Sequence, residues 1–136
     1  MQFVRRVSAV NYVNDSKATN VAAAIASIRS VDGMLVLIAG GEGKGGDFGA
    51  LAEPLEKKLR AAVLIGRDAE AIEAALDTII PTYFARDMDD AVQQAAAFAE
   101  SDDTVLLAPA CASFDQFDNY AARGDAFCKA VEALRP

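Results

Sequence analysis

Histidine is absent from the 136 residues of this chain. Its absence excludes Ser-His and Cys-His nucleophile pairs, and it excludes every zinc site with a histidine ligand. A general base in this chain would have to be a carboxylate, a lysine or a tyrosine. Cysteine is scarce as well, because only Cys111 and Cys128 are present and they form no Cys-x-x-Cys pair. Two such cysteines suit a reducing compartment rather than a disulfide framework.

Long apolar runs and basic clusters are also missing. The longest apolar stretches, such as residues 35–39, are far too short to span a bilayer, and residues 1–13 contain nothing that resembles a signal peptide. Thirteen Lys and Arg residues face twenty Asp and Glu residues, which gives a net charge of −7. Such a chain repels nucleic acid and anionic membranes. We therefore expect a soluble, cytoplasmic protein that binds neither.

The residues that are present have the balance of one globular domain, which we expect to span residues 1–136. Apolar residues make up 53 % and charged residues 24 %. Short apolar runs, several of them continuous as in strands covered on both faces, alternate with amphipathic stretches. The runs predicted as strands are residues 10–13, 35–39, 62–65, 82–84 and 104–108. The alternation predicts a Rossmann-like α/β domain with a mostly parallel sheet and helices on both of its faces.

Helical periodicity fills the segments between these runs. Apolar residues recur at spacings of three and four in residues 21–28, 51–59, 91–98 and 117–134. Gly124 lies in the last stripe, where it costs about 1 kcal/mol relative to alanine, and we expect close packing against the sheet to offset this cost. The predicted N-caps are Asp47, Asp87 and Asp115.

Three loops carry most of the polar chemistry, and each follows a predicted strand, where ligands bind in such sheets. They are Asn-Asp-Ser-Lys-Ala-Thr-Asn (residues 14–20), Gly-Gly-Glu-Gly-Lys-Gly-Gly-Asp-Phe (residues 40–48) and Pro-Ala-Cys-Ala-Ser-Phe-Asp-Gln-Phe (residues 109–117). In the first loop, a lysine and hydroxyls beside a helix N-terminus favour a phosphate or carboxylate site. A capped helix with solvated side chains is the alternative.

The second loop surrounds Lys44 with glycines. It is not a Walker A loop, because Ile38 occupies the position of the first glycine and Gly45 follows the lysine. A loop that presents one lysine to a ligand and a plain glycine-rich turn both remain open. In the third loop, Ser113 has no histidine partner and is interpreted as a hydrogen-bond donor to a ligand. Cys111 is interpreted as a small packed side chain rather than a reactive thiol.

The three motifs, in this order and over nearly the whole chain, resemble those of the C-terminal domain of the D-glutamate-adding Mur ligases. Sister Mur ligases carry histidine in the first motif, and this chain has none. The resemblance implies an ATP-dependent acid–amino-acid ligase of peptidoglycan precursor synthesis. In that reaction the carboxylate of UDP-N-acetylmuramoyl-L-alanine is phosphorylated, and the amine of D-glutamate attacks the acyl phosphate.

The resemblance also implies roles for individual residues. Asp15 would contact the ATP ribose, and Lys17 would contact the ATP phosphates and act catalytically on the transferring group. D-Glutamate would be held by Thr19, Lys44, Ser113, the backbone of Phe114, and Tyr120. No metal ligand is expected in this chain, because the phosphate loop, the Mg²⁺ ligands and most of the UDP-sugar site would lie in upstream domains. The chain would then be one domain of a three-domain ligase and inactive alone.

Two alternatives stay open. A folyl-polyglutamate-type ligase would also use glutamate, although the first motif argues against it. A non-catalytic flavodoxin-like or receiver-like binding module would also fit the fold. A receiver would need an aspartate after the third strand and a lysine after the fifth, where this chain has Gly66-Arg67 and Pro109.

Overall fold

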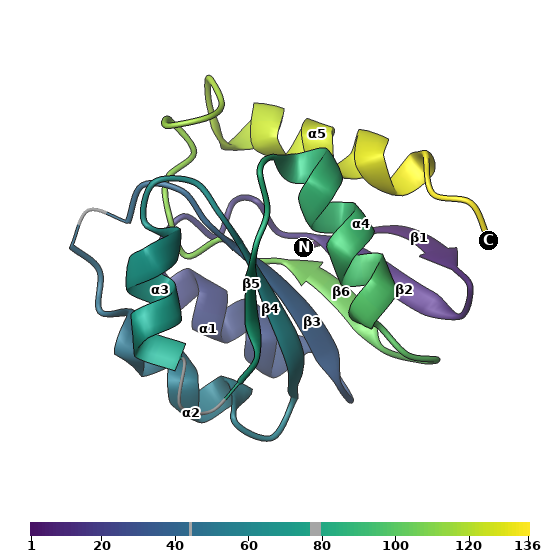
Figure 1. The fold of residues 1–136 in the computed structure, drawn as a ribbon, viewed down its shortest axis with the longest axis horizontal. Coiled ribbons are helices and arrows are strands. Elements are labelled where there is room, and N and C mark those ends of the chain that lie inside the picture. Colours follow the sequence, from purple (N-terminus) through teal and green to yellow (C-terminus); the bar gives the residue numbers. More distant parts are fainter. Residues whose placement is uncertain (44, 77–79) are drawn as a thin grey trace.

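The structure is a computed structural model that describes residues 1–43, 45–76 and 80–136. Strands and helices alternate along most of the chain, as Figure 1 shows. Their order is β1 (Gln2–Val7), β2 (Val10–Asn14), α1 (Val21–Ser30), β3 (Leu35–Gly40), the 3-10 helix η1 (Phe48–Leu51), α2 (Ala52–Leu55), β4 (Leu59–Ile65), α3 (Ala69–Leu76), β5 (Thr82–Phe84), α4 (Met88–Phe98), β6 (Thr104–Leu107) and α5 (Tyr120–Glu132).

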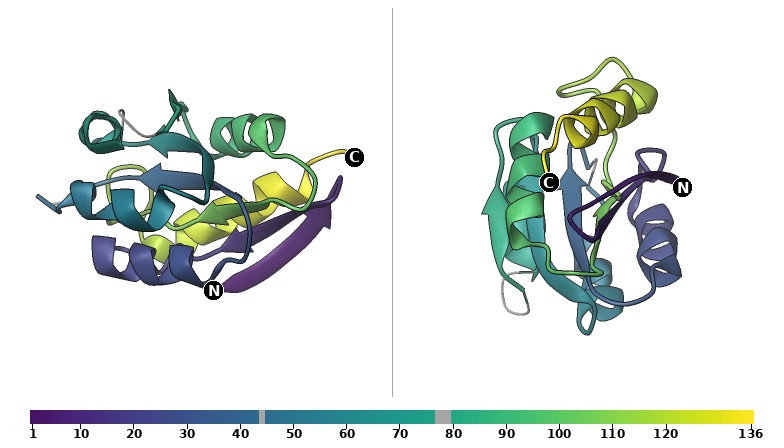
Figure 2. Two further views of the ribbon diagram at one scale, coloured as in Figure 1. Left: turned by 90° about the horizontal axis from the view of Figure 1, so that it is seen from below. Right: turned by 90° about the vertical axis from the view of Figure 1, so that its right-hand side faces the viewer.

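The strands form one sheet in the order β1-β2-β6-β3-β4-β5. The edge strand β1 is antiparallel to β2, and the other neighbouring strands are parallel. Helices α1, α2 and α3 pack on one face, and α4 and α5 pack on the other; the right-hand view of Figure 2 shows α1 and α4 on opposite sides of the sheet. The predicted α/β fold with a mostly parallel sheet is confirmed.

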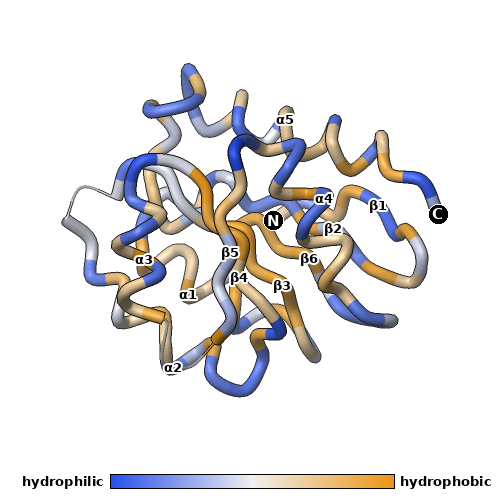
Figure 3. The backbone as a smooth tube through the Cα atoms, viewed as in Figure 1, coloured by the Kyte–Doolittle hydropathy of each residue, from blue (hydrophilic) through white to orange (hydrophobic). Residues whose placement is uncertain are grey.

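The central strands are buried on both faces. In β3, Leu35 and Leu37 face the cluster beneath α1 and α3, whereas Val36 and Ile38 face the cluster beneath α4 and α5. Successive side chains of a strand point to opposite faces, so a strand covered on both sides needs an unbroken apolar run. Figure 3 shows this as a hydrophobic centre with hydrophilic outer loops.

The first strand was not anticipated from the sequence. β1 pairs with β2 through a two-residue turn in which Ser8 has φ 50° and Ala9 has φ 63°. Hairpin turns with two positive φ angles usually carry Asn-Gly or Asp-Gly, which makes them readable in a sequence. Ser-Ala gives no such signal, so the hairpin went unpredicted.

Two predicted helices have different bounds. The segment predicted as helical over residues 51–59 contains η1 and the short α2, and Leu59 begins β4 instead of ending a helix. The last helix begins at Tyr120, so Phe117 precedes it, and its N-cap is Asn119 rather than Asp115. Asp87 caps α4 as predicted, whereas Asp47 precedes η1 without a side-chain cap bond.

Candidate functional site

The three polar loops meet at one end of the sheet. β6 pairs with both β2 and β3, so the carboxyl ends of these strands are adjacent. The N–H of Asp15 donates to the carbonyl of Leu107 at 2.8 Å. Glu42 and Ala112 exchange two backbone hydrogen bonds of 2.9 Å each. The first and second loops are therefore each tied to the end of β6 and the loop that follows it.

A pocket of about 720 Å³ lies between these loops, and we call it the loop pocket. Four of the residues predicted to hold D-glutamate line it: Thr19, Ser113, Phe114 and Tyr120. Ser113 is buried, whereas Phe114 and Tyr120 are exposed at the pocket. The predicted Lys44 lies outside the described residues, although Gly43 before it lines the same pocket.

Two helices begin at the loop pocket. The side chain of Asn20 caps α1 by accepting from the N–H of Ala23 at 2.9 Å, and Asn119 caps α5 by accepting from the N–H of Ala122 at 2.8 Å. Both caps line the pocket. A helix N-terminus carries a partial positive charge and amides without helical partners. Two of them at one cavity favour an anionic ligand beside the helix starts, while Glu42 and Asp47 add carboxylates elsewhere in the same lining.

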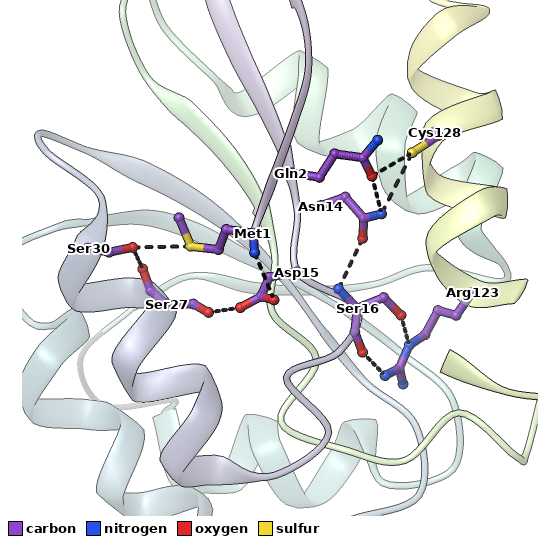
Figure 4. A network of polar contacts seen from close by, with 9 residues as sticks. All are labelled: Met1, Gln2, Asn14, Asp15, Ser16, Ser27, Ser30, Arg123 and Cys128. Carbon is purple, nitrogen blue, oxygen red and sulfur yellow. Dashed lines mark hydrogen bonds and ion pairs between the residues drawn. The ribbon is translucent and has the colours of Figure 1, made fainter. Parts of the chain in front are cut away.

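A second cavity of about 310 Å³, which we call the neighbouring pocket, contains the residues predicted to bind ATP. Asp15 and the exposed Lys17 line it, and Tyr120 lines it as well as the loop pocket. The carboxylate of Asp15 accepts a hydrogen bond from the Ser27 hydroxyl and lies 3.7 Å from the amino group of Met1 (Figure 4). The structure thus separates the two predicted groups of residues into adjacent pockets.

The loop after β4 also contributes to the site, and this contribution was not predicted from the sequence. The carboxylate of Asp68 accepts from the N–H of Gly43 at 2.6 Å, and the guanidinium of Arg67 pairs with Glu42 at 2.7 Å. The N–H of Arg67 donates to Asp115 at 2.8 Å, so the residue predicted as a helix cap binds this loop instead. In the sequence, only the Gly-Arg-Asp turn that follows an apolar run marked this loop.

Arg123 was also missed. It is 1 % exposed, and its guanidinium donates to the hydroxyl of Ser16 at 2.9 Å, to the carbonyl of Ser16 at 2.7 Å and to the carbonyl of Cys111 at 2.9 Å (Figure 4 draws the Ser16 bonds). Burial lowers the pKa of Arg123 to about 10. An arginine on an amphipathic helix is ordinarily a solvated residue, so nothing local predicted its burial.

The two cysteines differ. Burial raises the pKa of Cys111 to about 12, and the side chain is fully buried, which confirms a packed thiol rather than a reactive one. Cys128 is only half-buried. Its sulfur accepts from the Asn14 amide at 3.7 Å (Figure 4).

Metal ligands and membrane-spanning helices were both expected to be missing. Within the described ranges, no group of three or more Asp, Glu or Cys side chains is arranged to hold a metal ion. No helix in the part of the chain that the structure describes is long and apolar enough to cross a membrane.

Comparison with known families decides the affiliation. The model of the family described as Mur ligase, glutamate ligase domain, matches residues 1–111. The chain belongs to this family. Its relatives include proteins named UDP-N-acetylmuramoylalanine--D-glutamate ligase from Methylococcus capsulatus (52 % identical over 98 % of this chain and 29 % of the relative) and from Pseudomonas aeruginosa (52 % identical over 98 % of this chain and 31 % of the relative). The chain spans roughly 30 % of the length of these Mur ligases.

Solved structures agree on the fold. A murein peptide ligase from Psychrobacter arcticus superposes with a TM-score of 0.62 at 14 % identity, over 100 % of this chain and 30 % of that one. Folylpolyglutamate synthase of Mycobacterium tuberculosis superposes with a TM-score of 0.61 at 15 % identity, over 99 % of this chain and 32 % of that one. At these identities the likeness establishes a shared fold and does not identify a substrate.

Proposed function

We propose that this chain is the C-terminal domain of an ATP-dependent ligase that adds D-glutamate to UDP-N-acetylmuramoyl-L-alanine in the cytoplasm. The curated relatives that cover 98 % of the chain carry the name of that ligase. The observation that carries the proposal is the loop pocket, which combines Thr19, Ser113 and two helix N-termini. A dicarboxylate amino acid fits such a cavity because it presents two anionic groups to converging donors.

The neighbouring pocket supports the nucleotide half of the proposal. Asp15 offers a carboxylate to ribose hydroxyls, and the exposed Lys17 offers an ammonium to phosphate oxygens. An ammonium beside a transferring phosphoryl group offsets the charge that develops there, so Lys17 would act on turnover. Tyr120 lines both pockets, so the reacting amine and the activated carboxylate would meet near this side chain.

Magnesium ligation is assigned to another part of the ligase. When bound, Mg²⁺ would offset the negative charge of the ATP phosphates during phosphoryl transfer. The described residues offer no cluster of three carboxylate or thiol ligands. In the proposed division of labour, this domain supplies Asp15, Lys17, Thr19, Lys44, Ser113, Phe114 and Tyr120, and two upstream domains supply the metal site and most of the UDP-sugar site.

Ligand titration of this chain tests the proposed binding of D-glutamate. A ¹⁵N-labelled chain titrated with D-glutamate should show shifts at the amides of Thr19, Ser113 and Phe114, with smaller shifts for L-glutamate at the same concentration. Glycine provides the control for a ligand with a single carboxylate. Equal or stronger binding of L-glutamate would favour the folyl-polyglutamate type of ligase and contradict the proposal.

An activity assay tests the division of labour. With ATP, Mg²⁺, D-glutamate and UDP-N-acetylmuramoyl-L-alanine, the 136-residue chain should form no product. The longer protein that contains it should form the amide together with ADP and phosphate. Product from the 136-residue chain alone would overturn the division.

A further inference from the structure

Arg123 on α5 connects two loops from inside the protein, one that lines the neighbouring pocket and one that lines the loop pocket. Its Nε and Nη2 bind the hydroxyl and the carbonyl of Ser16, and its Nη1 binds the carbonyl of Cys111. We propose that Arg123 is a positioning residue that fixes two loops relative to each other, so that both substrates are held in reacting geometry. These are the loop of residues 14–20, on the nucleotide side, and the loop of residues 109–117, on the D-glutamate side. This inference rests on the proposed function, because it assigns a nucleotide to one loop and D-glutamate to the other.

The contacts of Arg123 lie next to the predicted substrate residues. Ser16 lies between Asp15 and Lys17 in the chain, and Cys111 lies two residues before Ser113. A shift of the guanidinium would therefore move the backbone of both loops. The hydroxyl of Ser16 also donates to the carbonyl of Tyr120 at 2.6 Å, which ties the same loop to the start of α5.

The backbone around Arg123 is shaped for close approach. A Cβ on Gly41 would lie 2.3 Å from the carbonyl oxygen of Ala112 and 3.4 Å from Nη1 of Arg123. A Cβ on Gly124 would lie 2.9 Å from the side-chain nitrogen of Asn14. Glycine at both positions lets the second loop and α5 come close enough for the guanidinium to reach Ser16 and Cys111 at once.

The chemistry of the contacts requires arginine. Three nitrogens of one planar group bind three acceptors in different directions, whereas lysine would bring a single nitrogen. None of the ion pairs found among the described residues includes Arg123, so its acceptors are neutral. Burying a cation whose hydrogen-bond acceptors are all neutral is costly, and the nearby Asp115 carboxylate offsets part of this cost. The positive charge of Arg123 is held directly against the two loops that line the pockets proposed to bind anions.

The test compares two arginines in the longer ligase that contains this chain. Arg60 at the start of β4 is the matched control, because it binds Asp103 at 2.5 Å and Glu100 at 3.0 Å at the opposite end of the strands. Arg123→Lys should raise KM for both ATP and D-glutamate about five-fold or more and lower kcat about ten-fold. Arg60→Lys should lower Tm while KM and kcat stay within about two-fold of the wild type.

The inference fails if Arg123→Lys lowers Tm but leaves KM and kcat within about two-fold of the wild type, because Arg123 would then serve stability alone. If the Arg123→Lys variant does not fold, the Ser16→Ala variant tests the inference instead. It removes the hydroxyl that bridges Arg123 and Tyr120, and it should raise both KM values in the same direction; unchanged KM values would overturn the inference. Failure of the proposed function is distinguishable, because the wild-type ligase would then form no product with D-glutamate, and both proposals would be overturned.

Discussion

The carboxylate of Asp68 accepts a hydrogen bond from the backbone N–H of Gly43 at 2.6 Å, and the N–H of Asp68 donates to the carbonyl of Gly41 at 2.9 Å. One residue of the loop after β4 thus holds two residues of the glycine-rich loop. The held segment ends directly before Lys44, whose predicted role is to bind a substrate carboxylate. A flexible glycine-rich segment would otherwise lose conformational entropy on binding, so this contact pre-organises it.

Removing the Asp68 carboxylate should weaken D-glutamate binding. In the proposed ligase, Asp68→Ala should raise KM for D-glutamate about ten-fold or more, with kcat nearly unchanged, because it removes a charge-assisted hydrogen bond of about 1.5–3 kcal/mol. Glu70→Ala, at an exposed position of α3, is the control and should leave KM unchanged. Steady-state kinetics at saturating ATP measure both variants. An unaltered KM for Asp68→Ala would show that the contact is irrelevant to the ligand.

The two loop lysines should affect different kinetic constants. Lys44→Ala should mainly raise KM for D-glutamate, because its predicted role is to bind a carboxylate in the ground state. Lys17→Ala should mainly lower kcat, because its predicted role is to offset charge on the transferring phosphoryl group. Steady-state kinetics of the proposed ligase distinguish these effects. A Lys44→Ala enzyme with the wild-type KM would refute the carboxylate role.

Gly40→Ala should abolish stable folding or nearly so. Gly40 has φ 124°, and a Cβ there would lie 1.9 Å from the backbone oxygen of Ile65 on the neighbouring strand. Neither strand can move without breaking the central sheet, so we expect a loss of about 4 kcal/mol or more in the free energy of unfolding. Gly33→Ala is the matched control, since Gly33 has φ 79° and a Cβ there would meet no atom of the described residues within 4 Å.

For Gly33→Ala we expect a loss of only about 1–2 kcal/mol, which is the cost of a positive φ for alanine. Denaturant unfolding followed by circular dichroism compares the two variants with the wild type. Similar losses for both would mean that backbone conformation, rather than the contact between β3 and β4, sets the requirement for glycine at position 40.

The buried thiol should make stability fall at alkaline pH. The folded-state pKa of Cys111 is about 12, above the ordinary value of 9.0, so the unfolded chain releases the proton first. Stability from this group is complete below about pH 9 and is lost as the pH rises toward about 12, by roughly 1 kcal/mol at pH 10. Cys111→Ala should show a flatter pH dependence of its free energy of unfolding between pH 8 and 10.

Thiol labelling provides an independent measurement. In the native protein, a water-soluble disulfide reagent should react with the half-buried Cys128 and leave Cys111 unmodified, and both should react after denaturation. Cys128→Ser is the control and should abolish the native reaction. Rapid native labelling of Cys111 would contradict its burial.

Local patterns were enough to place the strands β2 to β6 and the loops that follow them. The unbroken apolar run of β3 and the spacing in α4 are properties of a few consecutive residues, and they reflect burial on two faces of a strand or one face of a helix. The hairpin of β1 and β2 was not predicted because Ser8 and Ala9 adopt positive φ angles, although neither is a residue type that usually signals such a turn. The prediction of a helix up to Leu59 was wrong because Leu59 pairs with β3 and so belongs to a strand.

The sequence by itself determined the fold class and the three polar loops, because strand ends and loop chemistry are local. The resemblance of these loops to a known family, rather than the loops alone, supplied the predicted substrate contacts Asp15, Lys17, Thr19, Lys44, Ser113, Phe114 and Tyr120. Only the tertiary structure decided which distant groups hold those loops. Asp68 reaches Gly43 across 25 residues, and Arg123 reaches Ser16 across 107 residues. Such contacts depend on strand order and on the depth at which α5 packs, and neither is encoded in the neighbourhood of the residues that make them.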